Sequence, residues 1–360
     1  MLHLRGARSF RQGRFERAAR EAFDDGWTPE EKEASELATT VAIERARSIV
    51  STNDSPDVGF DRSINPYRGC EHGCIYCYAR PSHSYLELSP GLDFETKLFA
   101  KTNAAELLRA TLAKPGYRPA PIALGANTDC YQPIERKYRI TRQILGVLAE
   151  CEHPVSIVTK SALVERDLDI LVPMARRNLV KVFVSVGTLD RVLARRLEPR
   201  AASPQRRLDV IRRLNGSGVP CGVMVAALIP ALNDQTLEQV LEAAAAAGAR
   251  EAAYVVLRLP NELKDLFREW LEAHYPERAA HVVSIVRQMR GGRDNDPRFG
   301  TRMTGLGNYA ELIEKRFDVA CRRLGLNGHG APRRRIELDC TRFRPPAGPA
   351  APASQQLSLF

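Results

Sequence analysis

Short apolar runs alternate with longer amphipathic segments through the part of the chain between residues 122 and 273. Short β-branched or apolar runs predict buried strands, and apolar residues at helical spacing predict amphipathic helices. The predicted strands are residues 122–126, 155–159, 180–186, 221–228 and 253–259. The predicted helices are residues 141–151, 165–178, 203–215, 236–247 and 261–273. Ser203 caps the third helix, and Pro204 fits its first turn. This alternation favours a parallel sheet covered by helices.

The number of strand–helix units suggests an incomplete barrel. Together with the run that leads into a cysteine-rich segment at residues 63–81, the chain has about six units, fewer than the eight of a closed α/β barrel. A single barrel with extensions fits the length of 360 residues, and so do two domains. Ligands in parallel α/β folds bind at the carboxyl ends of the strands, so residues there are the first candidates for chemistry.

The segments outside this repeat differ from it in composition. Residues 1–54 are polar, charged and weakly periodic, and we expect a basic, loosely attached N-terminal arm. Residues 55–290 form the predicted core, which ends in a helix. Residues 291–344 form a predicted helical extension, and we expect its Gly- and Arg-rich first part to lie over the barrel mouth. Residues 345–360 are a Pro/Ala-rich tail.

Three cysteines define the cysteine loop, the segment SINPYRGCEHGCIYCYARP at residues 63–81. Cys70, Cys74 and Cys77 have the spacing C-x-x-x-C-x-x-C. Four thiolates complete a tetrahedral zinc site or a closed iron–sulfur cluster, whereas three leave one metal position without a protein ligand. The pattern therefore predicts a metal centre at which a small molecule can bind.

Two glycines support this interpretation, because Gly69 and Gly73 free the backbone to wrap around a metal centre. Two other interpretations remain open. One is a zinc knuckle whose fourth ligand is His72 or His83, and the other is a set of cysteines that are merely buried. The cysteines in apolar or amphipathic surroundings are predicted to be small core residues: Cys151, Cys221, Cys321 and Cys340.

An aromatic residue, Tyr76, precedes the third cysteine and makes the motif more specific. The motif resembles the signature of the radical SAM superfamily. The resemblance implies that Cys70, Cys74 and Cys77 hold a [4Fe-4S] cluster, and that S-adenosylmethionine (SAM) chelates the fourth iron. It also implies a partial (β/α)6 TIM-like barrel and a place for Tyr76 near the adenine. The implied reaction is reductive cleavage of SAM to methionine and a 5′-deoxyadenosyl radical.

The second predicted strand runs into a polar turn, Asn127, Thr128 and Asp129. The superfamily often carries Gly-Gly-Glu here, which receives the amino group of SAM. The resemblance therefore implies that this turn binds SAM, with Asp129 or Thr128 as the acceptor. The alternative is a turn that only faces solvent.

Polar residues on the following strands are candidates for the rest of SAM. Lys160 follows the third strand and Ser185 lies in the fourth, where both can reach the SAM carboxylate. Glu198 and Arg200 are expected to line the ribose or the carboxylate. The fifth strand would contribute backbone and apolar contacts to adenine. An exposed lysine or a buried serine without function would give the same pattern.

Within the superfamily, the segments YRGCEHGCIYCYARP, TDCYQPIE, IVTKS and LEPRAASP resemble the branch that contains spore photoproduct lyase. This resemblance covers roughly residues 57–290. The lyases carry a cysteine three positions before the aspartate of the second strand, and it returns hydrogen to the product radical. Ala126 occupies that position here, and Cys130 follows Asp129 instead. The thymine-dimer reaction is therefore not implied, although the SAM chemistry is.

The formal net charge of +10 favours polyanionic partners. Arginines concentrate after the fourth predicted strand and near the C-terminus: Arg195, Arg196, Arg200, Arg206, Arg207, Arg212, Arg213 and Arg333 to Arg335. With the branch resemblance, this charge predicts a nucleic-acid substrate, damaged or modified DNA. Solvated arginines on helix surfaces are the alternative explanation.

Two other functions fit the same sequence. One is a radical SAM enzyme that acts on a peptide or a small metabolite, and the other is a non-catalytic metal-binding interaction module. SAM cleavage would also need a reductant such as flavodoxin or ferredoxin as a partner. The sequence identifies no catalytic residue for the substrate reaction.

The cysteines and the apolar runs indicate a cellular compartment. Eight cysteines, three of them clustered, do not resemble a secreted disulfide framework. No apolar run approaches the roughly 18 residues of a membrane span, and the N-terminus lacks the apolar core of a secretion signal. We therefore expect a cytoplasmic protein without a membrane partner.

The last five residues, QLSLF, resemble the peptide by which many bacterial replication and repair proteins dock on the sliding clamp. Gln356, Leu357, Leu359 and Phe360 are the expected contact residues. The preceding uncharged Pro/Ala-rich segment would hold them away from the body of the protein. The alternative is that the apolar side chains fold back onto the same protein.

Overall fold

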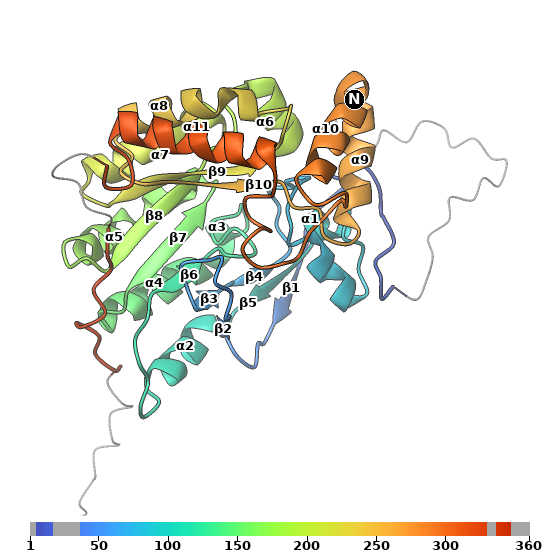
Figure 1. Cartoon of the computed structure of the whole chain (residues 1–360). Coiled ribbons are helices and arrows are strands. Elements are labelled where there is room, and N and C mark those ends of the chain that lie inside the picture. Colours follow the sequence, from blue (N-terminus) through green and yellow to red (C-terminus); the bar gives the residue numbers. More distant parts are fainter. Residues whose placement is uncertain (1–4, 17–36, 330–335, 347–360) are drawn as a thin grey trace, which may run out of the picture.

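A twisted, mostly parallel sheet forms the centre of the computed structural model, which describes residues 5–16, 37–329 and 336–346 (Figure 1). Its seven strands have the order β10-β9-β8-β7-β6-β3-β2. The bounds are β2 (Val50–Thr52), β3 (Arg62–Ile64), β6 (Ile122–Leu124), β7 (Val155–Thr159), β8 (Val180–Ser185), β9 (Cys221–Leu228) and β10 (Ala252–Val256). All neighbours pair in parallel except β2, which is antiparallel to β3.

The sheet confirms the expected partial barrel. Six parallel strands lie in the order of the chain from β3 to β10, and no pairing within the described residues joins β10 to β2. Helices follow the strands. Those on the outer face are α2 (Ala104–Leu112), α4 (Ile140–Glu150), α5 (Leu168–Ala175), α7 (Pro204–Gly216) and α8 (Leu237–Ala246) (Figure 1). The helices α6 (Arg191–Leu197) and α9 (Leu263–His274) pack beside the cysteine loop.

Local sequence explains where these helices begin. The Ser203 hydroxyl accepts a hydrogen bond from the Arg206 amide at 3.3 Å, which caps α7 as expected. The helix expected at residues 165–178 divides into a 3₁₀ helix, η2 (Ala162–Asp167), and α5. The division lies at Asp167, whose buried carboxylate pairs with the guanidinium groups of Arg142 and Arg166.

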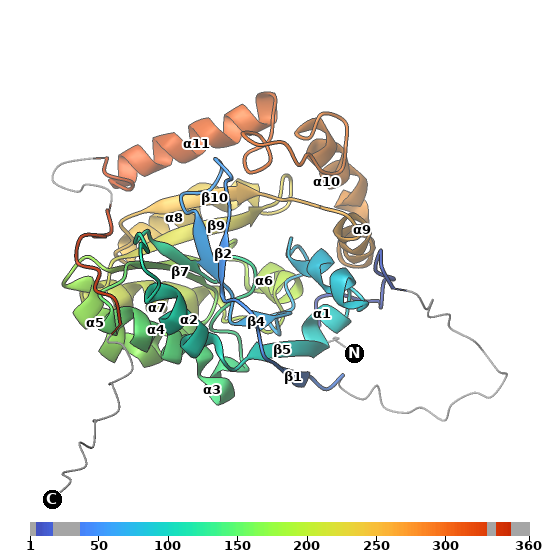
Figure 2. The same ribbon diagram turned by 90° about the horizontal axis from the view of Figure 1, so that it is seen from below.

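A small second sheet lies beside the barrel (Figure 2). It has the order β1-β5-β4, with β1 (Thr40–Glu44) parallel to β5 (Lys97–Lys101) and β4 (Tyr67–Arg68) antiparallel to β5. Short helical segments complete the description: η1 (Arg80–Leu86), α1 (Asp93–Thr96), α3 (Glu135–Tyr138) and η3 (Asp234–Thr236).

The N-terminal region differs from the loosely attached arm that we expected. Strand β1 pairs with the distant β5, and β2 pairs with the next strand, β3, so the boundary at residue 54 separates β2 from its partner. The pairing of β1 depends on a segment far along the chain, which a local pattern does not predict.

Residues 5–16, which we call the N-terminal strap, also bind the barrel. The amides of Gly6 and Ala7 donate to the Glu95 carboxylate at 2.9 and 2.8 Å. Further along, Ser9 donates to Glu269 of α9 at 2.8 Å, and Arg11 pairs with Asp265 of the same helix at 2.8 Å. The strap therefore joins the region of the cysteine loop to α9.

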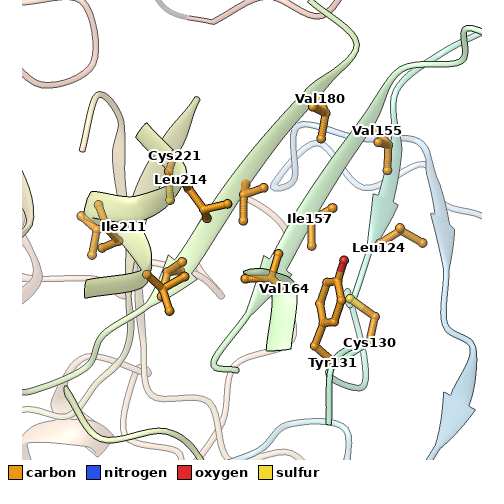
Figure 3. Packing of buried hydrophobic residues seen from close by; sticks show 14 of the residues in the cluster. Leu124, Cys130, Tyr131, Val155, Ile157, Val164, Val180, Ile211, Leu214 and Cys221 are labelled. Carbon is orange, nitrogen blue, oxygen red and sulfur yellow. The ribbon is translucent and has the colours of Figure 1, made fainter. Parts of the chain in front are cut away.

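The main core lies between the sheet and its outer helices. Figure 3 shows Leu124, Val155, Ile157 and Val180 from adjacent strands packed together. The cysteines expected in the core are buried at positions 151, 221 and 321, whereas Cys340 is only partly buried. Strands buried on both faces explain the continuous apolar runs in the sequence.

The C-terminal extension returns to the barrel. The helices α10 (Pro276–Gln288) and α11 (Asn308–Leu324) flank residues 289–307, and α11 packs against α8, where Arg316 pairs with Glu238 at 2.6 Å. The Asp339 amide donates to the Asn178 carbonyl at 2.9 Å. The expected docking residues Gln356, Leu357, Leu359 and Phe360 lie outside the described residues. No described helix is both long and apolar enough to cross a membrane.

Candidate functional site

The cysteine loop leaves the carboxyl end of β3 and folds as a series of tight turns. The amides of Gly73, Cys77 and Arg80 donate to the carbonyls three residues earlier, at 3.1 to 3.3 Å. Gly69 and Gly73 have φ angles of 73° and 68°, a region in which glycine is favoured. Cys70 and Cys74 are buried, Cys77 is partly exposed, and all three are free thiols.

A buried arginine, Arg80, fixes the loop from within. Its guanidinium donates to the carbonyls of Cys74 and Gly73 at 2.9 and 3.0 Å, and to that of Gly91 at 2.9 Å. It also pairs with Glu95 at 2.5 Å, the carboxylate that receives the strap amides. The sequence does not single out Arg80, because its partners lie in segments with no shared pattern.

The three thiols lie close enough to affect one another's ionisation. Burial raises the pKa of Cys70 well above its usual value, and the charges of Asp129, Cys74 and Cys77 raise it further. Burial also raises the pKa of Cys74 to about 12, although Lys160 lowers it. Thiolates in such surroundings need a bound cation. The donor set therefore fits a thiolate-bound metal centre.

The histidines proposed for a zinc knuckle have other contacts. The Nε2 of His83 bonds the Lys97 carbonyl at 2.9 Å, and its ring packs on Phe94. The Nδ1 of His72 lies 3.3 Å from a carboxylate oxygen of Asp129. Among the described residues, no group of three His, Cys, Asp or Glu side chains, the three clustered cysteines included, is arranged to hold a single metal ion.

Asp129, expected to accept the SAM amino group, already has protein partners on both oxygens. Oδ1 accepts from the Thr159 hydroxyl at 2.7 Å and the Tyr131 amide at 2.8 Å. Oδ2 accepts from the Lys160 amide at 2.7 Å and faces His72. Burial alone would raise the pKa of Asp129, but His72 and these donors lower it to about 2. The carboxylate thus ties β6 and β7 to the cysteine loop.

The two residues before Asp129 lie in different environments. Thr128 is buried, and its hydroxyl donates to the Tyr67 carbonyl at 3.0 Å. Asn127 is exposed, and its amide donates to Asn65 at 2.8 Å. The Tyr78 hydroxyl donates to the Ala126 carbonyl, so the cysteine loop covers part of this turn.

Three other expected SAM residues do gather at one place. The Lys160 ammonium donates to the Ser185 hydroxyl at 3.1 Å and lies 5.8 Å from the centre of the Tyr76 ring. Burial lowers the pKa of Lys160, but the charges of Cys74 and Glu198 outweigh this effect and leave it raised. A cation is therefore held at the carboxyl ends of β7 and β8, beside the cysteines.

Glu198 joins this group, and Arg200 does not. The Tyr76 hydroxyl donates a hydrogen bond to the Glu198 carboxylate, which also pairs with the buried Arg207. Arg207 in turn donates to the Ser185 carbonyl at 2.9 Å. Arg200 instead pairs with Glu71 of the cysteine loop at 2.7 Å. Sequence reasoning counted Arg207 only as surface charge, yet it orients the carboxylate beside Tyr76.

The arginine cluster after β8 is largely neutralised within the chain. Five of its seven members pair with a carboxylate: Arg200 with Glu71, Arg206 and Arg213 with Glu165, Arg207 with Glu198, and Arg212 with Asp209. The residues 333–335 of the second cluster lie outside the described residues. The arginine-dense helix therefore gives little support of its own to a nucleic-acid partner.

Comparisons with known proteins identify the family of this chain. Residues 64–244, half of the chain, match the family model described as the radical SAM superfamily. The chain belongs to the radical SAM superfamily. It is therefore an enzyme of that superfamily, and its membership implies SAM and an iron–sulfur cluster.

Relatives cover most of this radical SAM enzyme. An uncharacterised protein of Mycobacterium tuberculosis (strain H37Rv) is 40% identical over 84% of this chain and 82% of its own length. An uncharacterised protein of Methanocaldococcus jannaschii is 27% identical over 67% of this chain and 86% of its own. Among solved structures, spore photoproduct lyase complexed with dinucleoside spore photoproduct matches with a TM-score of 0.59 and 16% identity, covering 81% of this chain and 82% of that one. That likeness shows the shared fold.

Proposed function

We propose that Cys70, Cys74 and Cys77 bind a [4Fe-4S] cluster and that the enzyme cleaves SAM reductively. The observation that carries this proposal is the meeting of three free thiols with Lys160 and Ser185 at the carboxyl ends of the strands. When bound, the cluster supplies an electron to the SAM sulfonium, which yields methionine and a 5′-deoxyadenosyl radical.

The side chains around the thiols suit the parts of SAM. The Lys160 ammonium and the Ser185 hydroxyl would hold the SAM carboxylate through charge-assisted hydrogen bonds. Tyr76, fixed by Glu198, presents its ring beside Lys160 for adenine packing. Asn127, which is exposed after β6, would bind the SAM amino group. Thr128 and Asp129, whose side chains already have protein partners, would hold this turn in place. Arg200, which pairs with Glu71, would line the ribose side.

Metal content tests the cluster independently of catalysis. After anaerobic reconstitution with iron and sulfide, the wild-type chain should hold about four irons and show thiolate-to-iron charge-transfer absorption. Cys77→Ala should hold far less iron. Cys321→Ala, which removes a buried thiol of α11, should keep wild-type content. Stoichiometric zinc without iron after anaerobic purification would favour the zinc interpretation.

For the substrate, we propose a nucleic acid, damaged or modified DNA. The support is the net charge of +10 and the fold shared with a lyase whose solved complex holds a dinucleoside photoproduct. We do not extend the thymine-dimer reaction to this enzyme, because Ala126 occupies the position of the cysteine that returns hydrogen in the lyases. Cys130 is fully buried in the core (Figure 3). Oligonucleotide binding that weakens steeply with salt would support this substrate.

The rival proposals give different results in the same assays. SAM cleavage without oligonucleotide binding at low salt would favour a peptide or a small metabolite as the substrate. A cluster that never cleaves SAM would favour a non-catalytic module. We also propose flavodoxin or ferredoxin as the reductant. The protein that serves as reductant should replace dithionite in the SAM-cleavage assay.

A sliding clamp is proposed as a second partner on sequence grounds alone. The support is the motif QLSLF at residues 356–360, which follows an uncharged Pro/Ala-rich linker. Burial of three apolar side chains favours binding, whereas the entropy lost when five residues become ordered opposes it. The expected affinity is therefore micromolar at best. A QQLSLF peptide should bind a bacterial clamp in calorimetry. Its variant with Leu359→Ala and Phe360→Ala should not bind.

A further inference from the structure

An arginine without a carboxylate partner lies at the mouth of the barrel. Arg258 follows the carboxyl end of β10 and is partly buried. Its Nε is buried without a hydrogen-bond partner, and its Nη1 contacts the Met303 sulfur at 3.7 Å. Within the described ranges, no carboxylate oxygen lies within 4.0 Å of its guanidinium. Removing a guanidinium from water without a partner is costly.

The surroundings of Arg258 add positive charge and aromatic faces. Its guanidinium lies 5.4 Å from the centre of the Tyr78 ring, which is 43% exposed. Burial lowers the pKa of Arg258, and the charge of nearby Arg302 lowers it further. The charge of Asp57 raises this pKa, but the Asp57 carboxylate itself pairs with Arg302 at 2.5 Å.

A second aromatic ring lies on the outer side of this group. Phe299 is 55% exposed and packs 4.6 Å from the Arg302 guanidinium. Tyr78, Arg258, Arg302 and Phe299, which we call the mouth patch, thus combine two guanidinium groups with two partly exposed aromatic rings. Such a combination of cationic and aromatic groups is typical of surfaces that bind single-stranded nucleic acid through phosphates and bases.

The mouth patch is held in place by the backbone. The buried Arg290 donates to the carbonyls of Thr301 and Arg302 at 3.0 and 2.9 Å, and to that of Leu257 at 2.8 Å. The Val256 amide also donates to the Met303 carbonyl at 2.8 Å. Residues 289–307 are thereby tied to the end of β10, so the patch is preorganised for a ligand.

We propose that Arg258 binds a phosphate of the substrate strand at the barrel mouth, with a neighbouring base stacked on Phe299. This inference rests on the proposed nucleic-acid substrate. The planar guanidinium fork suits a phosphate through paired hydrogen bonds, and no carboxylate among the described residues pairs with it. The position two residues past β10 and beside the cysteine loop brings the bound strand to the reacting end of the barrel.

The test measures binding of a short fluorescein-labelled single-stranded oligothymidylate, and of an abasic strand of equal length, by anisotropy across a salt series. Arg258→Gln should weaken binding of both strands by roughly 10- to 100-fold. The slope of the logarithm of the binding constant against the logarithm of the salt concentration should also fall by the contribution of about one phosphate contact. Phe299→Leu should weaken only the oligothymidylate, by about 5- to 100-fold. Arg323→Gln, which removes an exposed positive charge on α11, should change neither by more than about twofold.

Two failures can be told apart. Wild-type protein that binds neither strand at low salt would overturn the nucleic-acid substrate, and with it the role of Arg258. Wild-type binding that Arg258→Gln leaves unchanged would overturn the role of Arg258 alone. SAM cleavage measured without DNA should be equal in wild-type and Arg323→Gln protein. Equal rates confirm that both preparations contain intact enzyme.

Discussion

Two arginines that contact the cysteine loop from within and from β10 have contrasting surroundings. Arg80 is completely buried, and its donors meet backbone carbonyls and the Glu95 carboxylate. Arg258 is partly buried and has only the Met303 sulfur as a polar contact among the described residues. The inner side of the loop is therefore completed by the protein itself. The side toward β10 holds a cation without a carboxylate partner among the described residues.

The contrast extends to the segments around each arginine. On the Arg80 side, the N-terminal strap lies so close that a Cβ at Gly6 would come 1.7 Å from the Gly73 carbonyl oxygen. On the Arg258 side, Tyr78 and Phe299 keep exposed aromatic faces. A buried polar group with all its partners contributes to the fold, whereas one without partners points to binding.

Replacement of each arginine by methionine should give the largest predicted difference, which is in the free energy of unfolding. Arg80→Met should lower the free energy of unfolding by about 3 to 5 kcal/mol, because it leaves the Glu95 carboxylate buried without its ion pair. Arg258→Met should change it by less than about 1 kcal/mol, since no ion pair is lost. Urea denaturation of the metal-free proteins measures both values. Equal losses would remove the distinction between the two arginines.

The cation beside the thiols should matter for SAM and not for the fold. Lys160→Met should weaken SAM binding to the reconstituted enzyme by roughly 10- to 100-fold, because a charge-assisted bond to the carboxylate is lost. Lys181→Met is the control, since Lys181 pairs with Glu251 at the other end of β8. Calorimetry or equilibrium dialysis gives the affinities. Unchanged SAM binding by Lys160→Met would exclude the proposed role.

The close contact of the strap gives a smaller effect. Gly6→Ala should push the strap away from Gly73 and speed tryptic cleavage within residues 5–16 by roughly tenfold. Gly59→Ala is the matched control, because a Cβ there meets nothing within 4 Å. Mass spectrometry of the timed digests measures the rates. Equal rates would show that the strap does not depend on this contact.

Sequence patterns predicted the strand–helix repeat better than they predicted the environment of the cysteine loop. The six parallel strands and the gathering of Lys160 and Ser185 follow from local periodicity and from the rule that parallel strands end at one edge. The partners of Arg80 and Arg207 could not be predicted, because such ion pairs join segments brought together only by folding. Charge counting likewise overestimated the free arginines of α7.

The most direct test of the central claim is the release of 5′-deoxyadenosine under anaerobic conditions. Reconstituted wild-type protein and Cys321→Ala should release it from SAM together with methionine when dithionite is present. Cys74→Ala should release none, because one of the three clustered thiols is lost. Wild-type protein that carries a full cluster yet forms no 5′-deoxyadenosine, or Cys74→Ala that forms it normally, would contradict the account.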